Sequence, residues 1–537
     1  MVRENDNAIK SMLPFLTLAW FIFVPNEIMA ARLVLQTVDD DSKNLVPCLV
    51  RLKAKGETVR SISTKFLNRG TGLPQNHPSR QWLCFPGTGE IDQVTGSLTI
   101  EAFAGPEYEV VKKNLLIDEE VDLHVKLQLK RIAHPSKYGW RSGNTHLHLN
   151  KISRAQADEY LRTVPASDGL ELVFVSNLRR AKDEKSYVTN EHRAVDLEKL
   201  STPDLKFGWG QEHRHNYGSH GQGYGHVMLL NIKRLIRPVS IGSGIMGKGT
   251  DYPSLQRGIR KARAQDATVV WCHNAFGLED IPNWFSGTLD AQNIFDGGGR
   301  GSYEDTFYRY LNVGLRVPFS TGTDWFIYDF SRVYAKVEGE FNQRTWLQAL
   351  RQGRSYITNG PLLELNCGER GIGDVIAIDK PQKLKFSGQG LAQNDFGKLQ
   401  ILHNGKVVKE TSSKAENGHF RAELEWEWNV NSPSWVALRV QSGHATIPAN
   451  APTRPRAKGV NVFGQGLFAH TSPIYVDYSG KRVFHKETAQ KLVKEMESDL
   501  DEILKKSNFA GDPEKMEVLR VYDEGIRNLE KQIATRQ

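Results

Sequence analysis

The chain has 537 residues, of which 39% are hydrophobic and 25% charged, so it is long enough for roughly three or four domains. This composition is typical of a globular protein. The formal net charge of +8 favours anionic ligands, but the Lys and Arg residues are spread along the chain without a long block, so we expect no nucleic-acid partner.

The first 31 residues resemble a secretory signal peptide. The apolar run MLPFLTLAWFIFV is short for a membrane span, and small residues follow it up to Ala30 and Ala31. We therefore expect an exported protein, periplasmic or extracellular, that begins near Ala31 or Arg32 and keeps no stable membrane span. The weakly positive segment before the run leaves two alternatives, an uncleaved anchor and an ordinary buried helix.

Residues 32–137 are predicted to form a β-sandwich. LTIEAFAG and DLHVKLQLK alternate apolar and polar residues, and the second segment places four apolar side chains on one face: Leu123, Val125, Leu127 and Leu129. Clusters such as NRGTGLPQNHP and CFPGTG separate the strands, as turns do in a sandwich. Four cysteines in the whole chain are too few for a disulfide-built fold, although in an exported protein Cys48 could pair with Cys84.

Residues 138–360 are predicted to alternate strands with helices. The strand-like runs are ELVFVSNL, GHVMLLNI, ATVVWCHN and PFSTGTDW, and the helical segments are SRAQADEYLRTV, YPSLQRGIRKARAQ, EDTFYRYLNVG and QRTWLQALRQG. This alternation indicates a largely parallel sheet, open or closed into a barrel. In such folds the chemistry lies at the carboxyl ends of the strands.

The last third of the chain is predicted to contain a second β-sandwich and a helical hairpin. Within residues 361–480, KLQILHNGKVVKE is a β-hairpin with Asn404-Gly405 at its turn. Within residues 481–537, apolar residues recur at helical spacing in two segments, the second beginning with Asp512 as N-cap and Pro513 at the first position. We expect these helices to pack on the body of the protein, with an oligomerisation element as the alternative.

Metal-binding side chains occur at several places in the α/β region. In NTHLHL, His146 and His148 are two residues apart, so both point to the same side of a strand. Glu212 lies in the histidine-rich stretch QEHRHNYGSHGQGYGH, His273 follows ATVVW, and Asp324 follows PFS. Two satisfied polar histidines would explain the first motif alone, but the four places together predict a divalent metal centre.

These motifs resemble the PHP (polymerase and histidinol phosphatase) metallohydrolases, and among them the CehA/McbA branch. The shared motifs are NTHLHL, a glutamate followed by GHVMLLNI, then WCHN, GTDW and GRSYITNGPLLEL, in this order. GPEY at residues 105–108 and GW at residues 139–140 extend the resemblance to the junction with a preceding β domain. The resemblance implies an α/β fold with a distorted seven-stranded βα barrel, flanked here by the two β-sandwiches and the helical hairpin.

The resemblance also implies one to three divalent ions, held by His146, His148, Glu212, His273 and Asp324, with Glu212 bridging two of them. Asn144 stands where the family usually has Asp, and residues 176–178 read Ser-Asn-Leu where it usually has Thr-Asp-His. Because these departures remove ligands of a third ion, we expect one or two ions. Zinc is favoured, with manganese and iron as alternatives.

The other residues of the stretch 211–226 divide between several predicted roles. His226 precedes the strand VMLLNI and is predicted to be a ligand or an acid/base. His213 and His215 are predicted to orient ligands or contact the substrate. His220 is interpreted as a loop residue, and Tyr217 and Tyr224 line the pocket or simply pack.

The sequence therefore predicts an exported metal-dependent hydrolase that uses metal-activated water on an ester, phosphoester or amide bond. No nucleophile elbow, P-loop or dinucleotide fingerprint competes with this prediction. The expected substrate is a small molecule or a glycan, and the positive net charge suits an anionic one. A non-catalytic binding protein on a degenerate PHP scaffold, or a glycan-processing enzyme with carbohydrate-binding sandwiches, are the alternatives. The bond cleaved and the oligomeric state stay open, because a fold does not determine them.

Overall fold

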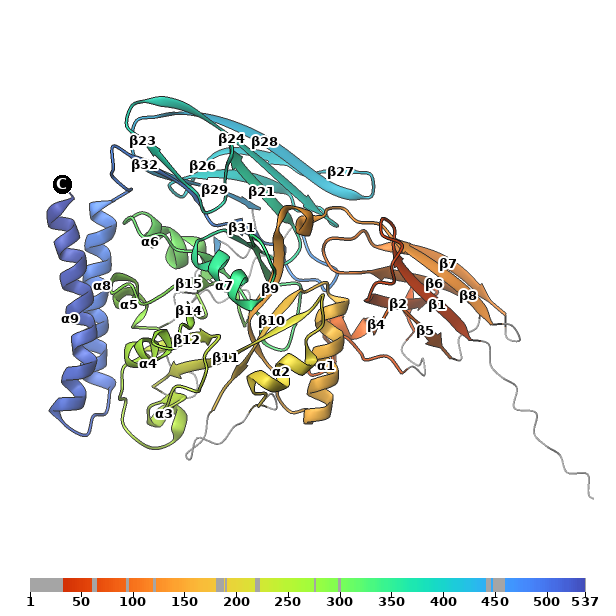
Figure 1. Cartoon of the computed structure of the whole chain (residues 1–537), viewed down its shortest axis with the longest axis horizontal. Helices are drawn as coiled ribbons and strands as arrows, with labels where there is room; N and C mark the ends of the chain where they lie inside the picture. The colour runs from red at the N-terminus through yellow and green to blue at the C-terminus, as the bar shows by residue number, and fades with distance from the viewer. Residues whose placement is uncertain are drawn as a thin grey trace, which may run out of the picture.

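A computed structural model describes residues 32–59, 65–92, 96–118, 122–179, 188, 191–217, 223–274, 277–297, 301–440, 446–447 and 459–536. The predicted signal peptide lies outside the described residues. The described part is a mixed α/β protein with more strand than helix, a half-barrel sheet near its centre and a C-terminal pair of helices (Figure 1). None of its helices combines the length and the apolar character that crossing a membrane requires.

The N-terminal part consists of two sheets that share one hydrophobic core. One sheet has the order β5 (Thr88–Ile91), β1 (Leu33–Asp39), β8 (Leu123–Leu129). The other has the order β3 (Glu57–Thr58), β2 (Cys48–Ala54), β6 (Gly96–Phe103), β7 (Val111–Ile117), with β4 (Leu83–Phe85) beside β2. The alternation predicted for β8 is confirmed, because Val125, Leu127 and Leu129 are buried while the residues between them are exposed. Both Cys48 and Cys84 are buried and free.

The central sheet has the order β17 (Phe319–Ser320), β15 (Ala291–Asn293), β14 (Thr268–Trp271), β12 (Gly225–Leu230), β11 (Lys206–His215), β10 (Leu172–Asn177), β9 (Trp140–His148). The other edge of β9 pairs with β18 (Asp324–Trp325) and β19 (Arg332–Lys336). Five of these neighbouring pairs are parallel, as predicted for alternating strands and helices. The difference is β12, which runs antiparallel to both β11 and β14, so the two ends of the stretch 211–226 pair as antiparallel strands.

The helices of the α/β region begin where the sequence provides caps. Ser153 and Gln156 form a capping box at the start of α1 (Arg154–Ser167), and Asn342 caps α7 (Gln343–Arg351). The others are α2 (Ala194–Leu200), α3 (Ser243–Met246), α4 (Leu255–Arg263), α5 (Asp280–Phe285) and α6 (Arg309–Leu311), the last preceded by a π-helical turn, η3 (Glu304–Tyr308). Short 3₁₀ turns, η1 (Pro78–Gln81) and η2 (Pro135–Tyr138), complete the set.

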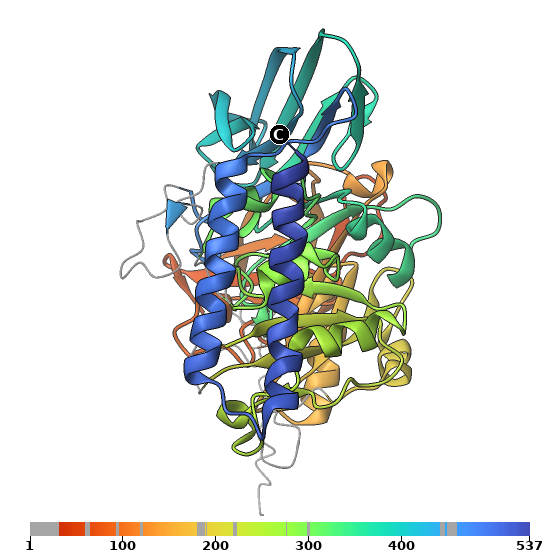
Figure 2. The same ribbon diagram turned by 90° about the vertical axis from the view of Figure 1, so that its left-hand side faces the viewer.

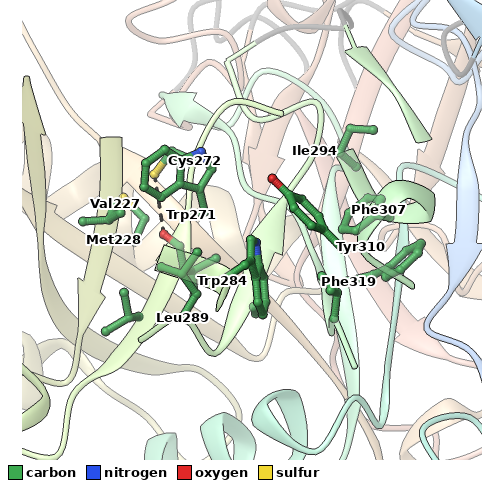
Figure 3. Packing of buried hydrophobic residues seen from close by; sticks show 14 of the residues in the cluster. Val227, Met228, Trp271, Cys272, Trp284, Leu289, Ile294, Phe307, Tyr310 and Phe319 are labelled. Carbon is green, nitrogen blue, oxygen red and sulfur yellow. Dashed lines mark hydrogen bonds between the residues drawn. The ribbon is translucent and has the colours of Figure 1, made fainter. Parts of the chain in front are cut away.

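Aromatic side chains fill the space between this sheet and its helices. Phe307 of η3 stacks on Phe319 of β17 with ring centroids 3.6 Å apart, and Trp284 of α5 lies 5.9 Å from Tyr310 (Figure 3). Trp271 at the end of β14 is completely buried. Strands buried on both faces explain why ATVVW and GHVMLL are continuous apolar runs.

The C-terminal strands form two sheets that share one hydrophobic core, and one of these sheets is hydrogen-bonded to the central sheet. One of their sheets has the order β22 (Arg370–Gly371), β21 (Leu362–Cys367), β24 (Gln382–Ala392), β28 (His419–Val430), β27 (Lys414–Glu416). The facing strands are β23 (Val375–Ile378), β25 (Lys398–His403), β26 (Lys406–Ser412), β29 (Ser434–Val440), β31 (Ala469–Thr471) and β32 (Ile474–Tyr478). They continue into the central sheet because β31 pairs with β20 (Ser355–Thr358), which pairs with β19.

The predicted hairpin turn at Asn404-Gly405 is present in the structure. Asn404 and Gly405 both have positive φ, 50° and 85°, as the tight turn between β25 and β26 requires. Across the chain, β16 (Gly301–Ser302) pairs with β30 (Thr446–Ile447). Among the described residues, strand pairing thus connects the C-terminal strands to the α/β region in two places.

The C-terminal helices α8 (Lys486–Lys506) and α9 (Asp512–Thr535) lie side by side along one flank of the molecule (Figure 2). Met496, Tyr522 and Leu529 belong to the same core as α5, so the hairpin packs on the body of the protein as expected. A Cβ on Gly525 would lie 2.7 Å from the Cβ of Pro282, which shows how closely α9 approaches α5. The cap of α9 is Gly511 and not Asp512, which is already helical.

A buried ion pair joins the N-terminal sheets to the α/β region. The Arg69 guanidinium donates to both carboxylate oxygens of Asp168, at 2.9 and 2.6 Å, and both side chains are completely buried. Arg69 also donates to the carbonyl oxygen of Ile327. The Asp168 main-chain oxygen in turn accepts from Arg332 at 2.9 Å.

Candidate metal centre

Elements far apart in the sequence bring the five predicted ligands together. His146 and His148 lie at the end of β9, Glu212 lies in β11, His273 follows β14, and Asp324 begins β18. The first three are buried, and the last two are partly exposed, so the cluster is not completely closed to solvent. Groups of three of these side chains place their ligand atoms close enough together to hold a metal ion.

The distances between these side chains suit a shared ion. With metal–ligand bonds of about 2.1 Å, two ligand atoms of one ion lie roughly 3.0–3.4 Å apart. His146 Nε2 lies 3.1 Å from His148 Nε2 and 3.4 Å from Asp324 Oδ1. His148 Nε2 lies 3.2 Å from Glu212 Oε2.

The two oxygens of Glu212 face different groups. Oε2 faces His148, whereas Oε1 lies 2.8 Å from His226 Nδ1 and 3.6 Å from His273 Nε2. His146, Glu212 and His273 also place ligand atoms within 4.8 Å of one another. This central position is the one that a carboxylate bridging two ions requires.

Hydrogen bonds on the far side of three imidazoles determine which nitrogen carries the proton. Nδ1 of His148 lies 2.9 Å from the Ser176 carbonyl oxygen, Nδ1 of His273 lies 3.1 Å from the Asp296 carbonyl oxygen, and Nδ1 of His146 lies 2.8 Å from Asp296 Oδ2. These oxygens only accept, so Nδ1 must donate, and in the neutral rings Nε2 then presents a lone pair. When the rings are neutral, these lone pairs face one another and two carboxylates, an arrangement that a bound cation would stabilise.

Asp296 is a site residue that the sequence reasoning missed. Besides its contact with His146, its Oδ1 accepts from the backbone N–H of His273 at 3.0 Å, and Asn293 donates to its Oδ2 at 2.9 Å. Asp296 lies shortly after the end of β15, just as the predicted ligands lie at or near the ends of their strands. The signal was weak because β15 has only three residues and QNIFDGGG contains no long apolar run.

Neighbouring charges shift the pKa values of two residues of the cluster. Burial lowers the pKa of His273, but Asp296, Glu212 and Asp324 outweigh it and raise this pKa to about 10. Burial raises the pKa of Glu212, but Arg214 and His226 outweigh it and hold this pKa well below its usual range. Glu212 is therefore ionised at neutral pH and offers an anionic ligand to a cation.

The backbone around the cluster is strained. Five non-glycine residues adopt the left-handed region, with φ between 56° and 65°: His273, Asn274, Phe295, Asp324 and Phe326. Such conformations cost about 1–3 kcal/mol each and persist where the surrounding structure enforces them, often at functional sites. Here they place His273 and Asp324 at sharp turns directly after or at a strand.

Strand alternation divides the residues of the β11–β12 hairpin into two sets. Glu212 faces the centre, and His226, on the paired strand, reaches its carboxylate. His213 faces the other way and packs on α4, where a Cβ on Gly258 would lie 2.2 Å from its Nε2. His215 Nε2 lies 2.8 Å from Asp251 Oδ1 while its Nδ1 accepts from the Tyr224 N–H.

The roles predicted for His213 and His215 are therefore corrected: these side chains support the back of the hairpin and do not point into the centre. Tyr224 stacks on His215, so it packs and does not line a pocket there. His220 lies outside the described residues, and its predicted role as a loop residue stays a prediction.

The turn between α8 and α9 holds this hairpin from behind. The Asn508 N–H donates to Asp251 Oδ2 at 2.7 Å, and the Asp251 N–H donates to the Asn508 carbonyl oxygen at 2.8 Å. The Tyr217 hydroxyl lies 2.8 Å from Ser507 Oγ. The C-terminal helices thus contribute to the position of the strand that carries Glu212.

The departures from the PHP motifs have structural roles. Asn144 donates to Thr323 Oγ1 at 2.8 Å and accepts from the His146 N–H at 3.0 Å, so it holds the His-x-His segment against the segment before Asp324. Ser176 supplies the carbonyl that orients His148. Comparisons of the chain with protein-family models, curated proteins and solved structures found no match.

Shortening Glu212 should damage the centre although the charge is kept. Glu212→Asp withdraws the carboxylate by roughly 1.5 Å, which is large against metal–ligand tolerances of about 0.2 Å. We expect turnover at saturating metal to fall about 100-fold or more, and His226→Ala to fall by about 10- to 100-fold. We expect His220→Ala to lose little turnover. Steady-state kinetics of the three variants measures the order of their losses of turnover. A His220→Ala loss as large as that of Glu212→Asp would contradict it.

Proposed function

We propose that the protein is an exported metal-dependent hydrolase of the PHP type, in which His146, His148, Glu212, His273 and Asp324 hold one or two divalent ions. The observation that carries the proposal is the set of three imidazoles whose Nδ1 atoms donate to fixed oxygens while their Nε2 atoms face two carboxylates. Three nitrogen and two carboxylate ligands favour zinc over calcium or magnesium.

A divalent ion bound here would lower the pKa of a coordinated water toward neutrality and polarise an ester or phosphoryl oxygen. The protein supplies orientation and a proton acceptor. Burial lowers the pKa of His226 to about 4, so this imidazole is neutral at pH 7. Its Nδ1 lies 2.8 Å from Glu212 Oε1 and its Nε2 lies 2.9 Å from Asn216 Oδ1, so the ring is held beside the centre, where it serves as a ligand or as an acid/base.

The rival proposal, a non-catalytic binding protein on the same scaffold, predicts metal without turnover. The deciding experiment is elemental analysis of protein purified without added metal, followed by a panel of chromogenic phosphoesters, carboxylic esters and amides. We expect about one or two ions per chain and turnover of at least one class, lost on chelation and restored by zinc or manganese. Bound metal with no turnover would favour the rival, and a metal-free protein that binds no added ion would contradict the centre itself.

A further inference from the structure

Arg214 is a buried cation on the inner face of the β11–β12 hairpin. Alternation along β11 places its side chain on the same face as Glu212, and the register places it opposite His226. Only 9% of the side chain is exposed. No motif in the sequence singled it out, because an isolated arginine between two histidines has no distinctive spacing.

The guanidinium of Arg214 is poorly satisfied for a group so deeply buried. Within the described part of the chain its one polar contact joins NH1 to Glu212 Oε2 at 3.5 Å, longer than an ordinary hydrogen bond, and its buried Nε has no partner. Other buried arginines of this protein are well satisfied. Arg69 donates to both oxygens of a carboxylate, and Arg332 donates to three carbonyl oxygens.

The contact with Glu212 does not satisfy the hydrogen-bonding groups of the buried Arg214 guanidinium. Both oxygens of that carboxylate already face imidazoles of the candidate centre, so its charge is shared with His148, His226 and His273. A cation held by Glu212 would draw on the same oxygens. A buried guanidinium in this position still needs an acceptor, since leaving its N–H groups unpaired is costly.

We propose that Arg214 binds an oxyanion of the substrate, a phosphate or a carboxylate group, beside the metal centre. The planar guanidinium presents parallel N–H groups that match two oxygens of either anion. The inference rests on the proposed function and narrows it, because it selects anionic substrates over neutral esters and amides. It makes Arg214 a specificity-determining residue for the reaction.

The test is anion binding to the metal-loaded protein, measured by titration calorimetry with inorganic phosphate and, separately, with acetate. We expect Arg214→Gln to weaken binding of the preferred anion by at least about 10-fold, as loss of a charge-assisted pair does, and Arg214→Lys to weaken it less. Arg344→Gln, which removes the same charge from an exposed position, should bind like the unmodified protein. Tighter binding of phosphate would indicate a phosphoester substrate, and tighter binding of acetate a carboxylate-bearing one.

Metal content separates this inference from the proposed function. Elemental analysis should show the same metal content in Arg214→Gln as in the unmodified protein. Equal anion binding by the two proteins would overturn the role of Arg214, as would loss of metal from Arg214→Gln, since the arginine would then only support Glu212. A metal-free unmodified protein would instead contradict the proposed function.

Discussion

The His146→Ala/His148→Ala double variant is expected, on the proposed function, to lose metal binding and more than about 100-fold of the hydrolytic activity while it keeps its fold. The upper limit for groups that only orient ligands is about 100-fold, and these two residues are proposed to be ligands themselves. The Nε2 atoms of both imidazoles lie 3.1 Å apart and face Glu212 and Asp324, so their loss leaves two carboxylates without the neutral donors. Elemental analysis and circular dichroism measure metal content and fold.

His124→Ala is the matched control, because it removes an exposed imidazole from β8 in the N-terminal sheets. It should keep both metal and activity. The single variants His273→Ala and Asp324→Ala should also lose metal and activity. Full metal occupancy in the double variant would show that the ion binds elsewhere.

Replacing Asp168 with alanine should destabilise the protein by about 3–5 kcal/mol, the cost of leaving a buried charge without its partner. The remaining Arg69 guanidinium has no access to water, and its other acceptors are carbonyl oxygens, among them that of Ile327. The pair connects the N-terminal sheets to the α/β region, so we expect the two parts to separate more easily. Urea unfolding followed by intrinsic fluorescence measures the change.

Glu427→Ala is the control for this prediction, because it breaks an exposed ion pair with Lys383. Exposed pairs contribute little, so the unfolding midpoint should not change measurably. The double replacement Arg69→Met/Asp168→Leu should recover part of the stability lost in Asp168→Ala, since it removes both charges together. If Asp168→Ala were as stable as Glu427→Ala, the buried pair would have no role in joining the two parts.

Strand periodicity made much of the fold predictable. The alternation of β8 and the apolar runs of β10, β12 and β14 reflect burial on one or both faces, which the order of residues records directly. The turn at Asn404-Gly405 was predictable for the same local reason. The antiparallel direction of β12 was not, because the run GHVMLL is equally apolar in either direction, and only its partners β11 and β14 decide it. The link from β20 to β31 likewise depends on residues more than a hundred positions apart.

The sequence by itself determined which residue types could hold a cation: His146, His148, Glu212, His273 and Asp324 each lie at or near a strand end, and the structure brings them together. Only the tertiary structure decided the rest. Asp296 joins the cluster because it follows β15, which lies beside the strands that carry the other residues, and β15 is too short for a sequence pattern to mark it. His213 and His215 leave it, and Arg214 enters it, because consecutive side chains of β11 point to opposite faces. The physical reason is that a strand's pattern tells which residues share a face, whereas the position of the whole sheet determines which face meets the ion.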